Sequence, residues 1–339
     1  MNSPLVSFMI INWNGKNYLE KCFTSIQEQT YPHIEVIMVD NGSSDDSILF
    51  TESSFPTVRI IKNTDNLGYV IAKNQAAKSA QGTYLFSLDS DTHLDRFCVE
   101  NLVKEMESDS RIGMCACHLK SYAGASELSC GFGCDFFSTA TYNDKEPFFS
   151  DGAGIFIRKD LYIEIGGFDE THFMYKEDVD LGWRVNLMGY RVFAAQKAIV
   201  YHMSGGVSGI EGKRLDAHWK NGTQYETNYR RRYLGEKNSL RNVLKNYSSL
   251  TLIWMIPLYV LVSVAEMLLF LCVGQPKTVL NCYLKAYGWN IRHLADTIKE
   301  HNRMQRLRKV GDLTILRKMD KRLGKYLSFR KMKRIPIVK

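Results

Sequence analysis

The sequence predicts an α/β protein with a mostly parallel sheet flanked by helices, followed by a helical C-terminal region. In the first hundred residues, apolar runs of strand length alternate with helical patterns, which is typical of a parallel sheet. Polar turns follow these runs, where the loops of parallel strands converge. A long apolar stretch with basic flanks lies beyond residue 235. We therefore expect an α/β domain at residues 1–235 and a helical, membrane-associated region with a basic tail at residues 236–339.

The composition is that of a folded globular chain. Its 339 residues, 45% of them hydrophobic, can bury one large core and a smaller appendage. The formal net charge is +8, and most of the excess base lies beyond Arg230, which favours an acidic surface as a partner. No charged and then apolar leader precedes the first apolar run, so we expect the N-terminal domain in the reducing cytosol.

Strands and helices are expected to alternate before residue 90. The strands are predicted at Val6–Ile11, Glu35–Val39, Val58–Lys62 and Thr83–Leu88, because each is a short apolar run. The helices are predicted through residues 19–26, after the capping residues 40–46, and at about residues 70–80.

Carboxylates stand at two of the predicted strand ends. Asp40 ends the second strand, and Asp89 and Asp91 flank a tight turn after the fourth. Ligands of open parallel sheets sit beyond these ends, and paired carboxylates there can bind a divalent cation and a nucleotide ribose. A helix cap is the alternative for Asp40, and an ordinary solvated turn is the alternative for Asp89 and Asp91.

Eight cysteines are scattered along the chain without a repeating framework. A zinc site could be assembled on paper from Cys115, Cys117, His118, Cys130 and Cys134, but their spacing differs from that of structural zinc sites. We expect reduced cysteines that serve as packing residues.

Three further motifs follow the acidic turn. They are Asp151-Gly152-Ala153-Gly154, then Ile165-Gly166-Gly167-Phe168-Asp169-Glu170, then Tyr175-Lys176-Glu177-Asp178 with Asp180, Trp183 and Arg184. Together with Asp40-Asn41-Gly42-Ser43, Asn66-Leu67-Gly68 and Asp89-Ser90-Asp91, this order and spacing resembles glycosyltransferase family 2, which has the GT-A fold. The resemblance covers about Val6 to Gly205 and looks closest to rhamnosyltransferase-like members that build bacterial and archaeal surface polysaccharides.

The resemblance implies a pocket for a nucleotide-sugar donor. Asp40 would accept the ring N–H of a uracil or thymine. Asp89 would contact the ribose, and Lys73 would contact the diphosphate. The pocket would be lined by Asn14, Asn66 and Gly68, and Gly152 and Gly154 would let the backbone approach the sugar.

The resemblance also implies the catalytic groups. Asp91 would bind Mg²⁺ or Mn²⁺ across the diphosphate, with His202 as a further metal ligand. Asp178 would be the general base that deprotonates the acceptor hydroxyl, so that the anomeric centre is inverted. The acceptor side would be formed by Glu177, Trp183 and Arg184. From the residues alone, Asp178 is also consistent with a carboxylate at a helix start, His202 with a packed or surface histidine, and Trp183 with a core residue.

Two departures from the family pattern bear on the reaction. Residues 68–72 lack the extra glycines of close rhamnosyltransferase relatives, so the expected donor is dTDP-rhamnose or a UDP-sugar. No Gln-x-x-Arg-Trp segment, the signature of processive polymer synthases, follows Asp178, so we expect transfer of one sugar or a few.

Two rival functions remain. A sugar nucleotidyltransferase would need a Gly-rich, basic loop in place of residues 12–15. A non-catalytic membrane adaptor with a degenerate transferase domain would not need Asp89, Asp91 and Asp178, all of which are present.

Leu250 to Val273 is an apolar stretch interrupted only by Pro257 and Glu266. Its length could span a bilayer, but the charge, the proline and the basic residues on both flanks favour a helical hairpin or in-plane helices over a single span. A core helix of a soluble bundle is the remaining alternative. From Arg303 onward the tail carries 14 Lys and Arg against two Asp, which favours a membrane surface with anionic lipid over nucleic acid. We expect a glycan acceptor linked to polyprenyl diphosphate, on the cytoplasmic face of the membrane.

Overall fold

The computed structural model describes residues 3–122, 127–141, 146–203, 218–220, 224–327 and 337–338. The chain divides into two compact units, of which the first comprises residues 1–132 and 144–214 and the second residues 133–143 and 215–339. The domain boundary at residues 235 and 236 stays a prediction. Residues 215–235 and the segment 133–143 nevertheless group with the C-terminal unit.

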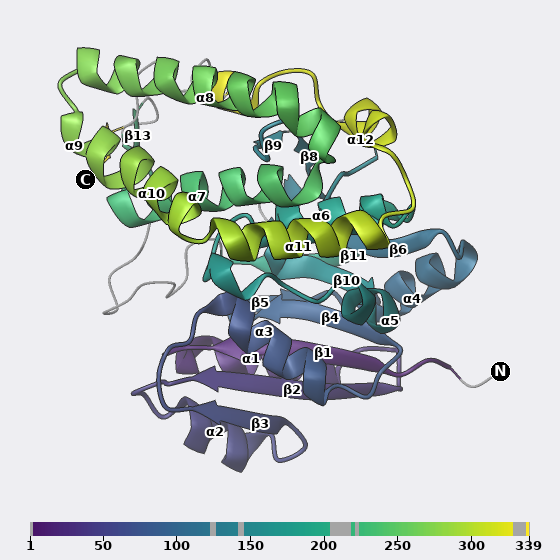
Figure 1. The fold of residues 1–339 in the computed structure, drawn as a ribbon. Helices are drawn as coiled ribbons and strands as arrows, with labels where there is room; N and C mark the ends of the chain where they lie inside the picture. The colour runs from purple at the N-terminus through teal and green to yellow at the C-terminus, as the bar shows by residue number, and fades with distance from the viewer. Residues whose placement is uncertain are drawn as a thin grey trace. The chain divides into compact units, whose positions relative to one another are not determined.

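The first unit is built around a mixed sheet of nine strands in the order β3-β2-β1-β4-β10-β6-β11-β5, with β7 paired to β6 (Figure 1). The strands are β1 (Val6–Asn12), β2 (Ile34–Asn41), β3 (Arg59–Asn63), β4 (Tyr84–Asp89), β5 (Thr92–Leu94), β6 (Ile112–Ser121), β7 (Glu127–Ser129), β10 (Ile155–Arg158) and β11 (Arg191–His202). Strands β1 to β4 are parallel, whereas β10 runs antiparallel to both β4 and β6. The four predicted strands are confirmed, with bounds that shift by one or two residues.

Helices flank this sheet. They are α1 (Lys16–Gln27), α2 (Ser47–Ser54), α3 (Tyr69–Ser79), α4 (Cys98–Ser108), α5 (Lys159–Glu164) and α6 (Glu177–Leu187), with the short 3₁₀ helices η1 (Gly152–Gly154) and η2 (Glu170–His172). Helix α1 buries Leu19, Cys22, Phe23 and Ile26, which recur at the spacing of one helix face. These side chains pack in the same core as Phe8 of β1.

The strand register brings three polar residues to one edge of the sheet. Asn12 at the end of β1 lies opposite Asp40 on β2, and Ile11 lies opposite Asp89 on β4. Because these strands are parallel, the polar ends of all three open toward the same loops. The local sequence predicts the strands β1, β2 and β4, and their register brings the polar residues at their ends together in the candidate site.

Gly68 shapes the turn that leads into α3. Its φ is +92°, and a Cβ there would lie 2.6 Å from the ring of Phe173. We expect Gly68→Ala to lower the free energy of unfolding by about 1–3 kcal/mol, because it adds both backbone strain and a clash. Urea unfolding measures this effect.

The matched control is Gly235→Ala, inside a helix of the second unit, where a Cβ would meet no heavy atom within 4 Å. It should change stability by less than about 1 kcal/mol, in the stabilising direction. An equal loss of stability in both variants would contradict the special role of Gly68.

The second unit is mainly helical. Its helices are α7 (Tyr229–Asn246), α8 (Ser249–Cys272), α9 (Pro276–Thr278), α10 (Lys285–Arg292), α11 (Leu294–Leu307) and α12 (Asp312–Lys318), with a π-helical segment at Val279–Leu284. Its short strands are β8 (Gly133–Cys134), β9 (Ala140–Thr141), β12 (His218–Lys220), β13 (Gln224–Thr227) and β14 (Ile337–Val338). Asp135, in the segment between β8 and β9, accepts a hydrogen bond from the backbone N–H of Gly324 at 2.7 Å. This buried carboxylate fixes the segment 133–143 to the C-terminal part of the same unit.

The cysteines behave as packing residues. Cys115 and Cys117 are buried on β6, and burial is the first cause that raises the pKa of both thiols. Among the described residues, the clusters with metal-ligand geometry contain carboxylates and histidines but no cysteine.

Candidate active site

Asp40 organises the loops after β1 and β2. Asn12 Nδ2 donates to Asp40 Oδ2 at 2.8 Å, while the backbone N–H and the hydroxyl of Ser43 donate to the two Asp40 oxygens at 2.9 and 2.6 Å. The Asp40 side chain is fully buried. The carboxylate thus holds the two loops together, and its predicted contact with a base stays a prediction.

The predicted pocket residues Asn14 and Asn66 lie on these loops. Asn14 has a φ of +52°, and its Oδ1 accepts a hydrogen bond from the backbone N–H of Ser44 at 2.7 Å. Asn66 Oδ1 accepts from Asn41 Nδ2 and from the N–H of Gly68, each at 3.0 Å. The amide side chains thus set the loop shape, and their contact with a nucleotide stays a prediction.

Asp89, Asp91 and His202 converge beyond β4. One ligand atom from each lies within 4.8 Å of the others, and His202 Nε2 is 3.4 Å from Asp91 Oδ1. Strand pairing brings His202 close to the acidic turn, because His202 at the end of β11 lies opposite Thr92 on β5. Residues that are far apart in the sequence therefore lie together at this turn.

The electrostatics of this cluster favour a cation. Burial alone would lower the pKa of His202, but Asp91, followed by Asp89 and Asp151, raises that pKa to about 9. Burial also raises the pKa of Asp89, whose Oδ1 is buried without a hydrogen-bond partner. Two carboxylates and an imidazole form a donor set that suits Mn²⁺ or Mg²⁺, so the residues present fit the predicted metal.

Lys73 lies beneath the acidic turn instead of facing a ligand. Its ammonium is fully buried and donates to the carbonyl oxygens of Met9 and Leu88 at 3.0 and 2.5 Å, and it lies 3.7 Å from Asp89 Oδ1. Burial lowers the pKa of Lys73 to about 8, although the charge of Asp89 opposes this shift. The predicted contact with a diphosphate is corrected, because the side chain ties β1 and β4 together and compensates the charge of Asp89.

We expect Lys73→Met to lower the free energy of unfolding by about 1–3 kcal/mol, because two buried carbonyls lose their donor and Asp89 loses its cation. Metal-dependent nucleotide binding should also weaken. Urea unfolding and a nucleotide titration with Mn²⁺ measure the two effects. Lys78→Met, on the exposed side of the same helix, is the control and should leave both unchanged. Equal stability of the two variants would refute the role of Lys73.

Gly152 occupies the space between the acidic turn and α6. Tyr69 Oη donates to the carbonyl oxygen of Gly152 at 3.0 Å. A Cβ at Gly152 would lie 3.2 Å from that hydroxyl and 3.9 Å from Glu177 Oε1, so a side chain would intrude among the carboxylates. Gly154 differs from the prediction, since its Cβ would meet Cys117 at 3.0 Å on the core side.

Glu177 and Asp178 open helix α6 after a strained turn. Phe173, Tyr175 and Lys176 all have φ between +63° and +70°, a region that non-glycine residues rarely adopt. Such strain persists where the surrounding structure enforces it, often at functional sites. The turn places two adjacent carboxylates at a helix N-terminus.

The two carboxyl groups hold their protons unusually tightly. Burial, followed by the charge of Asp151, raises the pKa of Asp178 to about 7. Burial, followed by the charge of Asp178, raises the pKa of Glu177 well above its usual value. Glu177 Oε2 is buried without a hydrogen-bond partner. A carboxyl group that titrates near neutrality is suited to accept a proton from a sugar hydroxyl.

Asp151 connects the acidic turn to α6. Its charge raises the pKa of Asp89 and His202 on one side and of Glu177 and Asp178 on the other. No role was predicted for Asp151 from the sequence, although this residue begins the Asp-Gly-Ala-Gly motif. Its side chain accepts from the N–H of Ala153 at 3.0 Å, so its sequence signal is that of a helix cap.

Two predicted acceptor-side residues are structural. Trp183 is fully buried and packs edge-on against Phe148, with ring centroids 6.1 Å apart. Arg184 is buried, pairs with Asp180 at 2.7 Å, and donates to the carbonyl oxygens of Ile165 and Gly167. The predicted Asp180–Arg184 pair is confirmed, and both Trp183 and Arg184 are buried within the protein.

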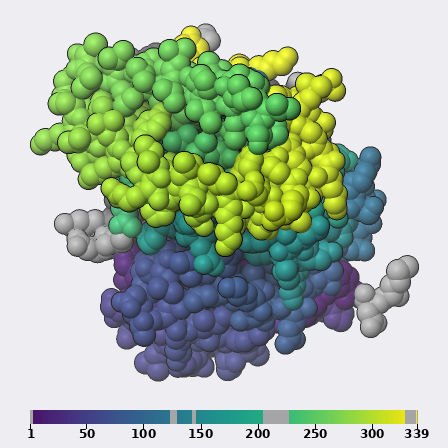
Figure 2. All heavy atoms as spheres, in the orientation of Figure 1, coloured from purple at the N-terminus to yellow at the C-terminus, as the bar shows by residue number. Residues whose placement is uncertain are grey.

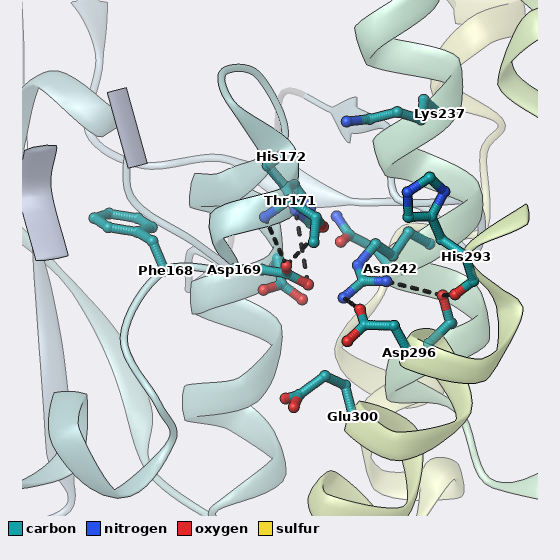
Figure 3. A network of polar contacts seen from close by, with 12 residues as sticks. Phe168, Asp169, Thr171, His172, Lys237, Asn242, His293, Asp296 and Glu300 are labelled. Carbon is teal, nitrogen blue, oxygen red and sulfur yellow. Dashed lines mark hydrogen bonds and ion pairs between the residues drawn. The ribbon is translucent and has the colours of Figure 1, made fainter. Parts of the chain in front are cut away.

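A second acidic group lies in the loop before α6. Asp169 Oδ1 accepts from the backbone N–H and the hydroxyl of Thr171 at 3.2 and 2.7 Å, and Asp169 Oδ2 lies 3.7 Å from His172 Nδ1 (Figure 3). With Asp180 these residues also have metal-ligand spacing. Because Arg184 already neutralises Asp180, we interpret the group as a support for the loop.

Residues 7–166 match the family model described as glycosyl transferase family 2. This part of the chain belongs to glycosyl transferase family 2. The predicted family is confirmed, and the rhamnosyltransferase-like subgroup stays a prediction.

Parts of the chain are similar in sequence to curated bacterial proteins of polysaccharide synthesis. A protein named "Putative teichuronic acid biosynthesis glycosyltransferase TuaG" of Bacillus subtilis (strain 168) is 34% identical over 107 residues, which is 31% of this chain and 41% of the relative. The chain thus spans about two fifths of that relative. The O-antigen biosynthesis protein RfbC of Myxococcus xanthus is 28% identical over 224 residues, which is 60% of this chain and 18% of RfbC.

A solved glycosyltransferase structure has a similar fold. The mannosyltransferase PcManGT from Pyrobaculum calidifontis, solved in complex with GDP-Man and Mn²⁺, aligns with a TM-score of 0.51 at 14% identity. The alignment covers 89% of this chain and 85% of the mannosyltransferase. At this identity the likeness shows the fold alone, and the predicted GT-A class is confirmed.

Proposed function

We propose that the chain is an inverting, metal-dependent glycosyltransferase that moves one sugar from a nucleoside-diphosphate sugar to a glycan acceptor. The observation that supports this most strongly is the arrangement around Asp151. Through it, the metal-binding candidates Asp89, Asp91 and His202 and the carboxyl group of Asp178 share one electrostatic environment. Transfer between a diphosphate and a hydroxyl needs a cation site and a base side by side.

Different residues of the chain have separate roles in the proposed reaction. The loops held by Asp40 and Asn41 form the floor of the nucleotide pocket, and Lys73 fixes the acidic turn from below. Asp178 accepts the proton of the acceptor hydroxyl as that hydroxyl attacks the anomeric carbon from the face opposite the leaving diphosphate. A bound Mg²⁺ or Mn²⁺ at Asp89, Asp91 and His202 would offset the charge that develops on the diphosphate.

Glu177 has a separate role in this proposal. Burial and the charge of Asp178 disfavour its anion and raise its pKa. The two neighbouring carboxyl groups therefore resist being ionised together, which favours a single base at this position. Direct contact between Glu177 and the acceptor stays a prediction.

The donor and acceptor follow from chemistry and from the relatives. A uracil or thymine nucleotide, as in a UDP-sugar or dTDP-rhamnose, suits a pocket rich in amide and hydroxyl groups. Relatives named for teichuronic acid and O-antigen synthesis point to a cell-surface polysaccharide. We therefore place the reaction at the cytoplasmic face of the membrane, on an acceptor linked to polyprenyl diphosphate.

A screen of UDP-, dTDP- and GDP-sugars tests the reaction. The full chain should release a nucleoside diphosphate from at least one donor, only with Mn²⁺ or Mg²⁺ present, and faster when a lipid-linked glycan is added. Release of pyrophosphate from a nucleoside triphosphate would instead identify a nucleotidyltransferase. Absence of metal-dependent nucleotide binding would point to an adaptor.

A further inference from the structure

Helix α8 has two unlike faces. The buried residues repeat every three or four positions and include hydroxyl and carboxyl groups; they are Thr251, Met255, Tyr259, Ser263, Glu266 and Phe270. The uncovered residues are large and apolar, with Leu250, Ile253 and Leu261 exposed to 78%, 71% and 65%. Figure 2 shows α8, in green, on the outside of the C-terminal unit. The helix therefore turns its polar side toward the protein and its apolar side outward, the reverse of a helix on a soluble surface.

Glu266 explains why the polar side stays covered. Lys325 Nζ lies 2.8 Å from Glu266 and 2.8 Å from Glu236 of α7, and Arg232 of α7 contacts Glu266 and lies 3.0 Å from Glu236. Two carboxylates and two cations thus neutralise one another within one unit. Separation of α8 from α7 would leave the Glu266 carboxylate without its two cationic partners, which is costly in a low-dielectric medium.

The whole length of α8 is held against its own unit. Tyr259, near the middle of the helix, packs edge-on against Phe137 with ring centroids 5.5 Å apart. Near its start, Ser248 donates its backbone N–H to Asp312 at 2.8 Å. A helix of 24 residues measures about 36 Å and is long enough to cross a bilayer, so length does not decide the arrangement. The contacts along its length do, because a crossing helix would expose the polar stripe to lipid or draw the unit into the membrane.

Exposed cations accompany the apolar face. The helices and the turn that follow α8 expose Lys277, Lys285, Arg292 and Lys299 together with the apolar Leu284 and Ile291. Large apolar side chains beside lysine and arginine match the boundary of an anionic bilayer, where acyl chains meet negative headgroups. A second copy of the chain would bring like charges together.

We propose that α8 lies in the plane of one leaflet of an anionic bilayer, with the face around Leu250, Ile253 and Leu261 inserted and the Glu266 side held by the protein. The inference rests on the second unit alone. It does not depend on the proposed transfer reaction, so either can fail without the other. In this arrangement α8 anchors the protein to the membrane surface and does not cross the bilayer.

The depth of the middle of α8 tests the arrangement. Leu261→Trp in a Trp254→Phe background places a fluorophore at mid-helix, and Trp254→Phe alone gives the signal of the other tryptophans. The full chain is reconstituted by detergent removal into vesicles of phosphatidylcholine and phosphatidylglycerol, so that either arrangement can form. Lipids brominated near the headgroup should quench the added signal at least twofold more than lipids brominated near the chain ends. Stronger quenching by the deep bromines would show a span and overturn the proposal.

Binding to preformed vesicles provides a second test. Leu261→Asp should lower cosedimentation with anionic vesicles at least tenfold, because it places a charge on the inserted face. Asn302→Asp adds the same charge at an exposed position of α11 and should reduce binding less than twofold. Equal losses in both variants, or binding by neither parent nor variants, would overturn the proposal. Self-association of the parent chain that Leu261→Asp abolishes would assign the face to a second copy instead.

Discussion

Asp178→Asn should lower kcat by about 10²- to 10⁴-fold, the usual contribution of a positioned general base. The amide keeps the size of the side chain and the N-terminal position on α6, but it has no lone pair basic enough to take the proton of a sugar hydroxyl. Binding of donor and Mn²⁺ should change little, because Asp178 is not among the candidate metal ligands. Transfer rates and nucleotide titrations separate the two effects.

Glu164→Gln is the matched control for this variant. Glu164 is an exposed carboxylate on α5, so its neutralisation changes the net charge equally without touching the site. It should keep the parent kcat. Full transfer activity of the Asp178→Asn protein would remove Asp178 from the mechanism.

The pH dependence of transfer follows from the same carboxyl group. Burial and then Asp151 raise the pKa of Asp178 to about 7, and only the ionised form can act as a base. The rate should therefore fall tenfold per pH unit below about 7 and level off above it. A rate that stays constant from pH 5 to 8 would contradict the assignment.

The raised pKa also has a consequence for stability. A carboxyl group whose pKa is higher in the folded state destabilises the fold as pH rises through the interval from its unfolded value, 3.8, to about 7. Asp178→Asn should therefore raise the melting temperature at pH 8 but not at pH 3.5. Such a gain fits the general observation that active sites carry groups that oppose stability.

The sheet could be predicted because its signals are local. Each strand is an apolar run, and the turns after β1, β2 and β4 contain the residues that end strands and cap helices. The acidic turn was found because it follows a predicted strand, and Asp178 was found through the spacing of family motifs. Their meeting with His202 depends on the pairing of β11 with β5, which no local pattern encodes.

The errors concern direction, because a residue's type does not show which way its side chain points. Lys73 and Arg184 were expected to bind phosphate or acceptor, yet both are buried and donate to backbone carbonyls. For Trp183 the sequence left an acceptor-side position and a core position open, and the side chain fills the core beside Phe148. The opposite error occurred at Asp151, whose capping pattern hid its electrostatic role. Only tertiary packing separates these cases.

The segment 133–143 shows a further limit of sequence patterns. It lies between two parts of the first unit in sequence, yet it groups with the second unit. Asp135 holds it there through contacts with residues more than a hundred positions away, such as Gly324. A domain boundary drawn as a single point along the chain does not represent such an exchange.

Asp91→Ala should abolish metal-dependent donor binding. Asp91 is the buried member of the cluster with Asp89 and His202. Its Oδ1 lies 3.4 Å from Nε2 of His202. Its loss removes one anionic ligand and leaves the His202 imidazole without its carboxylate partner, so the affinity for nucleotide in the presence of Mn²⁺ should fall about a hundredfold or more, and transfer should fall with it. Calorimetric titration of a nucleoside diphosphate with and without Mn²⁺ measures the loss.

Glu28→Gln, which neutralises an exposed carboxylate just after α1, is the control and should bind as the parent does. The fold should survive in Asp91→Ala, since the loss of one carboxylate relieves repulsion with Asp89 and Asp151 when no metal is bound. A folded Asp91→Ala protein that retains Mn²⁺-dependent nucleotide binding would show that the cation is held elsewhere. The second acidic group at Asp169, His172 and Asp180 would then become the site to test, through the binding of Mn²⁺ to an Asp169→Ala variant.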